Sequence, residues 1–294
     1  MEKTLFLGNG LNRTLDNGLS WAEVMRELGS TCCSEECVPF PIEFEEMAAN
    51  NGCTIGRRAA DPYVELRSLL AEEIMGLGLG SNKCHGAFRD LNMDHVITTN
   101  YDLIFDSIFA PEKVITNPGS SRNILKPISR TQTTDFFHAH GIAQWKNTLC
   151  LGHEHYASLM GKIRDEFYSK DNEGATENLT SLVTGNRPCK HIWPELLFTT
   201  DVAIVGLGLD YCEIDLWWLL SMRAALFQPS NNLTAYENEI IYYWVDTGVP
   251  LSPYEQGKHR ALRALSVSPL SVPASNYSEG YLEIARKLKT HWAE

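Results

Sequence analysis

The chain has 294 residues, of which 44% are hydrophobic and 21% are charged. This is ordinary globular composition, and a chain of this length can bury a large core without disulfides or metals. Its 25 basic and 37 acidic residues give a net charge of −12. That balance argues against a direct nucleic-acid surface, because such surfaces need clustered Lys and Arg.

No apolar run reaches the roughly 18 to 20 residues that span a bilayer, and the N-terminal run is too short for a signal peptide. We therefore expect a cytoplasmic protein that has no membrane partner. The cysteines are then expected to be reduced thiols. They are Cys32, Cys33, Cys37, Cys53, Cys84, Cys150, Cys189 and Cys212.

The N-terminal segment predicts a strand, a glycine turn and a helix in succession. Residues 3–7 form a short apolar strand, and Gly8-Asn-Gly-Leu-Asn12 follows it directly. Ser20 is expected to cap a helix, because apolar residues recur at helical spacing after it. This order is typical of the opening of a dinucleotide-binding fold.

Residues 30–90 are expected to form a helical insertion, since apolar residues at helical spacing alternate there with Asn-Gly and Asp-Pro breakers. Strand-like runs then resume and alternate with helical patterns at 155–168, 214–227 and 280–292. The expected strands are 95–99, 113–116, 135–139, 201–205, 240–245 and 264–267. This alternation predicts an α/β fold, a Rossmann-like parallel sheet with helices on both faces. A polar stretch at 169–177 is expected to be a mobile surface loop.

Two glycine-rich turns follow predicted strands. In Gly8-Asn-Gly-Leu-Asn12 and in Gly206-Leu-Gly-Leu-Asp210, bare backbone could approach a pyrophosphate at a strand end. The first turn has two glycines of the three-glycine fingerprint, with Arg13 in the third place. Each turn by itself is equally compatible with an ordinary connection between a strand and a helix.

Two polar motifs also end predicted strands. In Thr98-Thr-Asn-Tyr-Asp102, Asn100 and Asp102 share one face of an extended segment, although they could instead cap the helix that follows. In His138-Ala-His-Gly141, two histidines on one strand face could act as a base or hold a metal. A strand histidine is more often a satisfied core residue.

The four motifs together resemble the sirtuin (SIR2) superfamily, and specifically the SIR2-like domains of bacterial NADases in antiphage defence. The resemblance covers about residues 1–290 and implies one SIR2-like catalytic domain over 1–294. It implies that Asn100 positions the attacking group, His140 contacts ribose and acts as base, and Asp102 contacts the nicotinamide amide. The residues that it implies for NAD binding are Gly8, Asn9, Gly10, Asn12, Arg13, Trp21, Thr99, Tyr101, Gly206, Gly208 and Asp246. Because Asn100 and His140 are expected at strand ends rather than in the core, alanine at either position is expected to spare the fold.

The implied activity is hydrolysis of NAD+ to nicotinamide and ADP-ribose, with no metal. Sirtuin deacylases carry a zinc ribbon of two Cys-x-x-Cys pairs, and this sequence has no such pairs. Leu151-Gly-His-Glu-His155 is expected to be a loop and helix cap rather than a metal site. The alternatives are an NAD-dependent protein deacylase and a non-catalytic subunit that binds NAD or ADP-ribose. A Rossmann dehydrogenase is disfavoured, because no second catalytic domain is visible.

The resemblance also implies regulation. A SIR2-like domain would use nearly all of the chain, so control is expected from homo-oligomerisation, from a small ligand or from an activating partner protein. The implied partner is encoded in the same defence operon: an Argonaute-like protein, a HerA-type ATPase or a nucleotide pyrophosphatase-like subunit. The protein would then be the NAD-depleting effector of an abortive-infection system.

Overall fold

A computed structural model describes residues 1–27, 38–50, 64–109, 113–114, 117–168 and 175–292. The cysteine cluster Cys32, Cys33 and Cys37, residues 115–116 of an expected strand and most of the expected loop at 169–177 lie outside these ranges. Within them, no helix has the length and apolar character needed to cross a membrane.

The described residues form an eight-stranded sheet in the order β3-β4-β5-β2-β1-β6-β7-β8. Its strands are β1 (Lys3–Leu7), β2 (His95–Thr98), β3 (Lys113–Val114), β4 (Ser129–Arg130), β5 (Asp135–His138), β6 (Asp201–Val205), β7 (Ile240–Asp246) and β8 (Ser268–Pro273). Along the sheet, all neighbours in the run β5-β2-β1-β6-β7-β8 pair in parallel. At one edge, β4 pairs antiparallel with both β3 and β5. The predicted parallel sheet is therefore confirmed, except at that edge.

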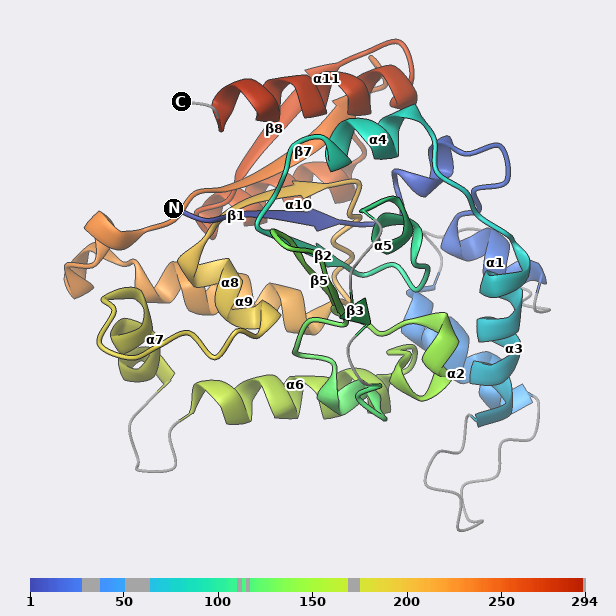
Figure 1. Cartoon of the computed structure of the whole chain (residues 1–294), viewed down its shortest axis with the longest axis horizontal. Coiled ribbons are helices and arrows are strands. Elements are labelled where there is room, and N and C mark those ends of the chain that lie inside the picture. Colours follow the sequence, from blue (N-terminus) through green and yellow to red (C-terminus); the bar gives the residue numbers. More distant parts are fainter. Residues whose placement is uncertain (28–37, 51–63, 110–112, 115–116, 169–174, 293–294) are drawn as a thin grey trace.

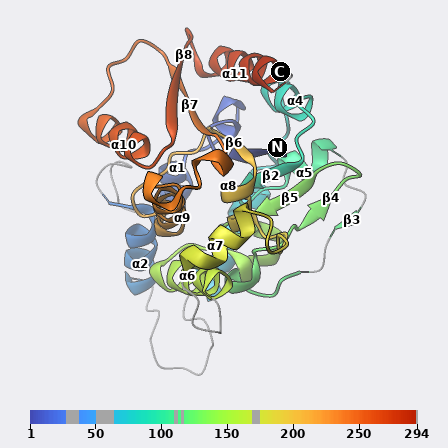
Figure 2. The same ribbon diagram turned by 90° about the vertical axis from the view of Figure 1, so that its left-hand side faces the viewer.

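Helices cover both faces of the sheet, as expected (Figure 1). They are α1 (Trp21–Glu27), α2 (Phe40–Asn50), α3 (Val64–Gly76), α4 (Lys83–Arg89), α5 (Ile104–Phe109), α6 (His153–Phe167), α7 (Ala175–Val183), α8 (Trp193–Thr199), α9 (Ile214–Leu226), α10 (Pro253–Ala264) and α11 (Tyr277–His291). Figure 2 shows α4 and α11 on one side of the sheet and α6 and α7 on the other.

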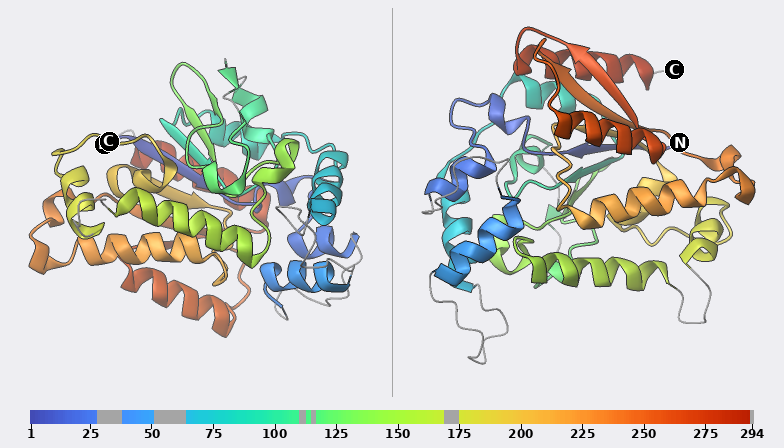
Figure 3. Two further views of the ribbon diagram at one scale, coloured as in Figure 1. Left: turned by 90° about the horizontal axis from the view of Figure 1, so that it is seen from below. Right: turned by 180° about the vertical axis from the view of Figure 1, so that it is seen from behind.

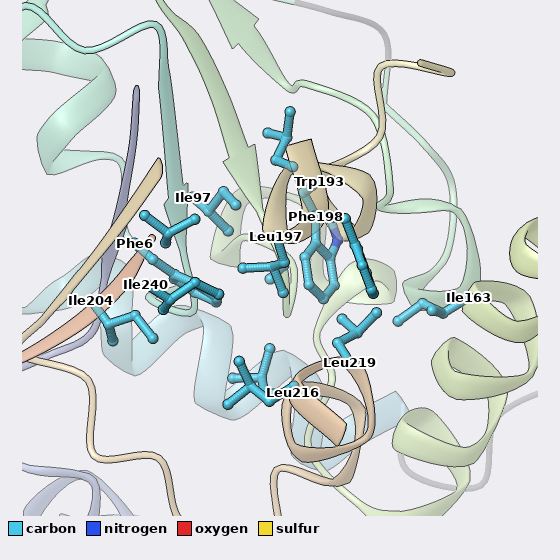
Figure 4. Packing of buried hydrophobic residues seen from close by; sticks show 14 of the residues in the cluster. Phe6, Ile97, Ile163, Trp193, Leu197, Phe198, Ile204, Leu216, Leu219 and Ile240 are labelled. Atoms are coloured by element: carbon cyan, nitrogen blue, oxygen red, sulfur yellow. The ribbon is translucent and has the colours of Figure 1, made fainter. Parts of the chain in front are cut away.

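The central strands are buried on both faces, which explains why they read as continuous apolar runs. Successive side chains point to opposite faces. In β1, Phe6 packs into the core beneath α8 and α9, whereas Leu5 and Leu7 pack toward α4, α5 and α11. Figure 4 shows the first of these cores, in which Phe6 and Ile204 lie near Trp193 and Leu216.

The helical insertion forms a small core of its own at the end of the sheet where β1 finishes. There α2 and α3 contribute Phe44 and Leu70 to a buried cluster that also contains Tyr101 and Leu151 from the sheet side. Figures 1 and 3 place α1, α2 and α3 together at this end, away from the N-terminus. The insertion therefore lies beside the carboxyl ends of the parallel strands, where doubly wound sheets bind ligands.

The predicted strand at 264–267 is wrong. Ser252 and Glu255 form a capping box that starts α10, and this helix runs to Ala264. Ser266, with φ of 55°, then turns the chain so that the strand begins at Ser268. The expected loop at 169–177 also ends too late, because α7 starts at Ala175.

Candidate active site

A cavity of about 390 Å³ lies at the carboxyl ends of the strands. Its walls combine the two glycine turns with side chains from the insertion, from α10 and from α11. They include Asn9, Gly10, Arg13, Ser20, Phe40, Thr99, Tyr101, His140, Tyr156, Gly206, Gly208, Asp210, Cys212, Glu213, Tyr242, Trp244, Lys258, His259 and Tyr281. This volume and this location at strand ends are typical of a small-molecule or cofactor site.

The two glycine turns are in direct backbone contact. The Gly8 and Gly10 amides donate to the carbonyls of Val205 and Gly206 at 3.1 and 2.8 Å. A Cβ atom on Gly8 would collide with the Leu207 Cα, whereas Gly208 has open space around it. Glycine at position 8 thus allows the β1 and β6 turns to touch, and glycine at position 208 leaves backbone bare beside the cavity.

This difference predicts that substitutions at the two glycines have unequal effects on stability. Gly8→Ala forces two backbone segments apart and is expected to destabilise the fold by about 1–3 kcal/mol, the usual cost of overpacking. Gly208→Ser is expected to change stability by less than about 0.5 kcal/mol. Urea denaturation of both variants checks this, and equal stability of the two proteins would contradict it.

His140 lines the cavity and is held by a buried carboxylate. Its Nε2 lies 3.0 Å from Asp215 Oδ2, and the exposed fractions of the two residues are 2% and 0%. Tyr156 packs edge-on against the imidazole, with ring centroids 5.2 Å apart. Burial lowers the pKa of His140, but the Asp215 carboxylate and its hydrogen bond outweigh burial and raise that pKa above its ordinary value.

The turn after β6 carries acidic side chains and is held by hydrogen bonds within it. The Asp210 amide donates to Glu213 Oε2 at 2.8 Å, and Asp210 Oδ1 accepts from the Cys212 amide at 3.1 Å. Leu209 has φ of 48°, a left-handed conformation that costs energy for a branched residue. Such strain persists where surrounding contacts hold the chain, and it clusters at functional sites.

Asn100 and Asp102 lie behind the cavity wall, not in it. With Asn9 and Tyr101 they line a neighbouring cavity of about 20 Å³, enough to hold one water molecule. Asn9 and Tyr101 line both cavities. The buried Asn100 Oδ1 has no hydrogen-bond partner among the described residues, so it is available to such a molecule.

Both carboxylate oxygens of Asp102 accept a hydrogen bond from the protein. Its Oδ1 accepts from the Ile104 amide at 3.0 Å, which is the helix-capping alternative, and its Oδ2 accepts from Asn12 Nδ2 at 2.7 Å. Asn12 Oδ1 in turn lies 3.1 Å from His85 Nε2. This chain of contacts ties the first glycine turn to α5 and α4, and neither Asn12 nor Asp102 lines the main cavity.

His138 and His140 do not share a surface, contrary to the expectation from their spacing. The strand ends at His138, and Gly141 turns the chain with φ of 93°. His138 Nε2 therefore lies 3.0 Å from Asp106 Oδ2 on α5, whereas His140 reaches Asp215 on α9. His138 is the satisfied core residue that strand histidines usually are.

The expectation that Asn100 and His140 lie outside the core is also wrong, because they are only 4% and 2% exposed. The strand ends are covered by the insertion and by α6 and α9. A substitution at either position therefore acts on the core as well as on the site.

Most of the expected NAD-binding residues line the main cavity: Asn9, Gly10, Arg13, Thr99, Tyr101, Gly206 and Gly208. Gly8 and Asn12 lie behind them, in the backbone and side-chain contacts given above. Asp246 does not line the cavity, because its Oδ1 accepts from the Gly248 amide at 3.0 Å in the turn after β7. The Trp21 side chain lies outside what the structure describes.

Several residues that line or support the cavity were not predicted from the sequence. Asp215 and Glu213 follow the second glycine turn as closely spaced acids at a helix start, a pattern that could have flagged them. Lys258 and Tyr281 come from α10 and α11, far along the chain, and nothing local marks them. Lys258 Nζ donates to the Gly208 carbonyl at 2.6 Å and thereby connects α10 to the glycine turn.

The remaining motif, His153-Glu-His155, starts α6. His155 Nδ1 accepts from the Gly152 amide at 3.1 Å, so the expected helix cap is confirmed. In the part of the chain that the structure describes, no three His, Cys, Asp or Glu side chains gather as the ligands of one metal ion would.

Comparison with known families agrees with this geometry. Residues 94–216 match the family model described as SIR2-like domain. The match includes the motifs at Asn100, His140 and Gly206 and extends through Glu213 and Asp215. No curated protein matches the chain. Over residues 94–216 the chain is therefore similar to SIR2-like domains, and SIR2-like proteins use NAD+ as substrate.

Proposed function

We propose that the protein hydrolyses the bond between nicotinamide and ribose in NAD+ and releases nicotinamide and ADP-ribose. The observation that carries this proposal is that His140, paired with the buried Asp215, lines a cavity bounded by both glycine turns. Bare backbone there suits a pyrophosphate, and an oriented imidazole suits a ribose hydroxyl.

The reaction passes through a transition state with positive charge on the ribose, so the leaving nicotinamide needs little acid assistance. The protein has to hold the ribose and present water. Because His140 Nε2 is occupied by Asp215, the other ring nitrogen, Nδ1, is the one available to a ribose hydroxyl. In this proposal Asn100 holds the water, because it lines the small cavity and its Oδ1 has no hydrogen-bond partner among the described residues.

The test is incubation of the purified chain with NAD+, followed by chromatography and mass spectrometry of the products. Nicotinamide and ADP-ribose in equal amounts, formed also in the presence of a metal chelator, are the expected result. An arm with an acetylated peptide distinguishes deacylation, which yields acetylated ADP-ribose. NAD+ that stays intact in all arms would contradict the proposal. In a cell the proposed activity would deplete NAD+, which fits the role in antiviral defence that the sequence resemblance implies.

A further inference from the structure

Glu213 lies on the wall of the main cavity together with His140. It is the residue that precedes α9, two positions before Asp215, and its side chain is half-buried. One carboxylate oxygen, Oε2, is fixed by the Asp210 amide at 2.8 Å. The structure shows no hydrogen bond to the other oxygen, Oε1, from any described residue, so Oε1 is available to a bound molecule.

The surroundings of Glu213 keep its side chain a neutral carboxylic acid below neutral pH, so that it ionises to a carboxylate only as the pH reaches neutrality and rises further. Burial raises its pKa to about 7, against the opposing attraction of His140 and with a further contribution from Asp215. The titratable groups that face it come from several elements: His140, Asp215, Asp210, Cys212, Lys258, Tyr101, Tyr156 and Tyr242. A base is most effective when its pKa lies near the working pH.

His140 is less suited to be that base. Its Nε2 is bound to the Asp215 carboxylate, and this pairing favours the protonated imidazole. A protonated imidazole donates hydrogen bonds and does not accept a proton. Of His140 and Glu213, which both line the main cavity, Glu213 therefore has the free oxygen and the proton affinity that a base requires.

We propose that Glu213 is a further catalytic residue, the general base that takes a proton from the attacking water. This inference rests on the proposed hydrolysis of NAD+. In that step the bond between C1′ of the ribose and the nicotinamide nitrogen breaks, and its electron pair stays on nicotinamide. The water oxygen bonds to C1′, and the proton of the water passes to Glu213 Oε1 and then to solvent. The carboxylate also stabilises the positive charge that develops on the ribose.

The test compares Glu213→Gln with wild type over pH 5 to 9. Glutamine keeps an oxygen that can accept the Asp210 amide, so the turn is preserved. We expect kcat to fall by about 10²–10⁴-fold, the range for loss of a positioned base, while KM changes by only a few fold. Wild-type kcat should rise as the pH increases through about 7, because the base is active when it is ionised, and this rise should be absent in Glu213→Gln.

Glu23→Gln is a matched control. Glu23 Oε2 accepts the amide of Ser20, three residues earlier, at 2.7 Å, which is the same local arrangement, but Glu23 does not line the cavity. Its kcat and pH profile should equal those of wild type. Glu213→Asp keeps the carboxylate and should retain the rise with pH at a reduced kcat, which covers the case in which Glu213→Gln fails to fold.

The outcomes separate the two proposals. If wild type hydrolyses NAD+ but Glu213→Gln or Glu213→Asp keeps the wild-type kcat, or changes KM alone, the role of Glu213 as base is overturned while the proposed function stands. If wild type leaves NAD+ intact, the proposed function fails, and the role of Glu213 fails with it.

Discussion

His140→Ala is expected to abolish NAD+ cleavage and, at the same time, to destabilise the protein. Loss of one preorganised hydrogen-bond donor typically lowers kcat by about 10²–10³-fold. The alanine also leaves the Asp215 carboxylate, which is 0% exposed, without its cationic partner. Removing one member of a buried pair costs about 3–5 kcal/mol, so the variant should unfold at a clearly lower urea concentration than wild type.

The double variant His140→Ala/Asp215→Ala separates the two effects. Without the buried carboxylate it should regain part of the lost stability, yet its turnover should remain as low as that of the single variant. His291→Ala is the control, because His291 pairs with Glu239 at 2.7 Å on the surface, where both side chains are more than 40% exposed. Wild-type turnover of His140→Ala would refute the catalytic role of His140. Unchanged stability of this variant would refute the stabilising role of the His140–Asp215 pair.

Asp106→Ala is expected to lower the free energy of unfolding as much as His140→Ala does, by about 3–5 kcal/mol. It should have little direct effect on NAD+ cleavage. Asp106 is paired with the buried His138 at 3.0 Å and also accepts the Ser129 hydroxyl, away from the main cavity. The control is Asp165→Ala. Asp165 pairs with Arg122 at 3.4 Å, but both side chains are more than half exposed, and such pairs contribute about 0–1 kcal/mol.

The Asp106 pair also predicts a pH dependence of stability. Burial raises the pKa of Asp106, but the charge of His138 and the hydrogen bonds with His138 and Ser129 outweigh burial and lower that pKa. Burial lowers the pKa of His138, but the charge of Asp106 and its hydrogen bond outweigh burial and raise that pKa. The stability that an acid such as Asp106 contributes, when folding lowers its pKa, is lost as the pH falls through its pKa in the folded state. The stability that a base such as His138 contributes, when folding raises its pKa, is lost as the pH rises through its pKa in the folded state. The stability difference between wild type and Asp106→Ala should therefore be largest between about pH 4 and 6.5, and a difference independent of pH would contradict this.

The sheet could be predicted from the sequence because local chemistry determines it. Buried parallel strands must be apolar on both faces, so residues 3–7, 95–98, 135–138 and 201–205 read as short apolar runs. The glycine turns and polar motifs follow these strands directly. Since carboxyl ends of parallel strands meet at one edge, the sequence also predicted that Gly10, Tyr101, His140 and Gly206 would lie together.

Only the tertiary structure decided which of these side chains face the cavity. His138 and His140 have the same residue type and lie two positions apart, but the strand ends between them and sends them to different helices. Asp102, which was expected to contact the substrate, lines the small cavity, and its oxygens accept hydrogen bonds from Asn12 and Ile104. Asp215 and Glu213 enter the site because α9 packs beneath the sheet beside His140. That contact joins residues about 75 positions apart, and no local pattern encodes such a distance, because it depends on how whole elements pack.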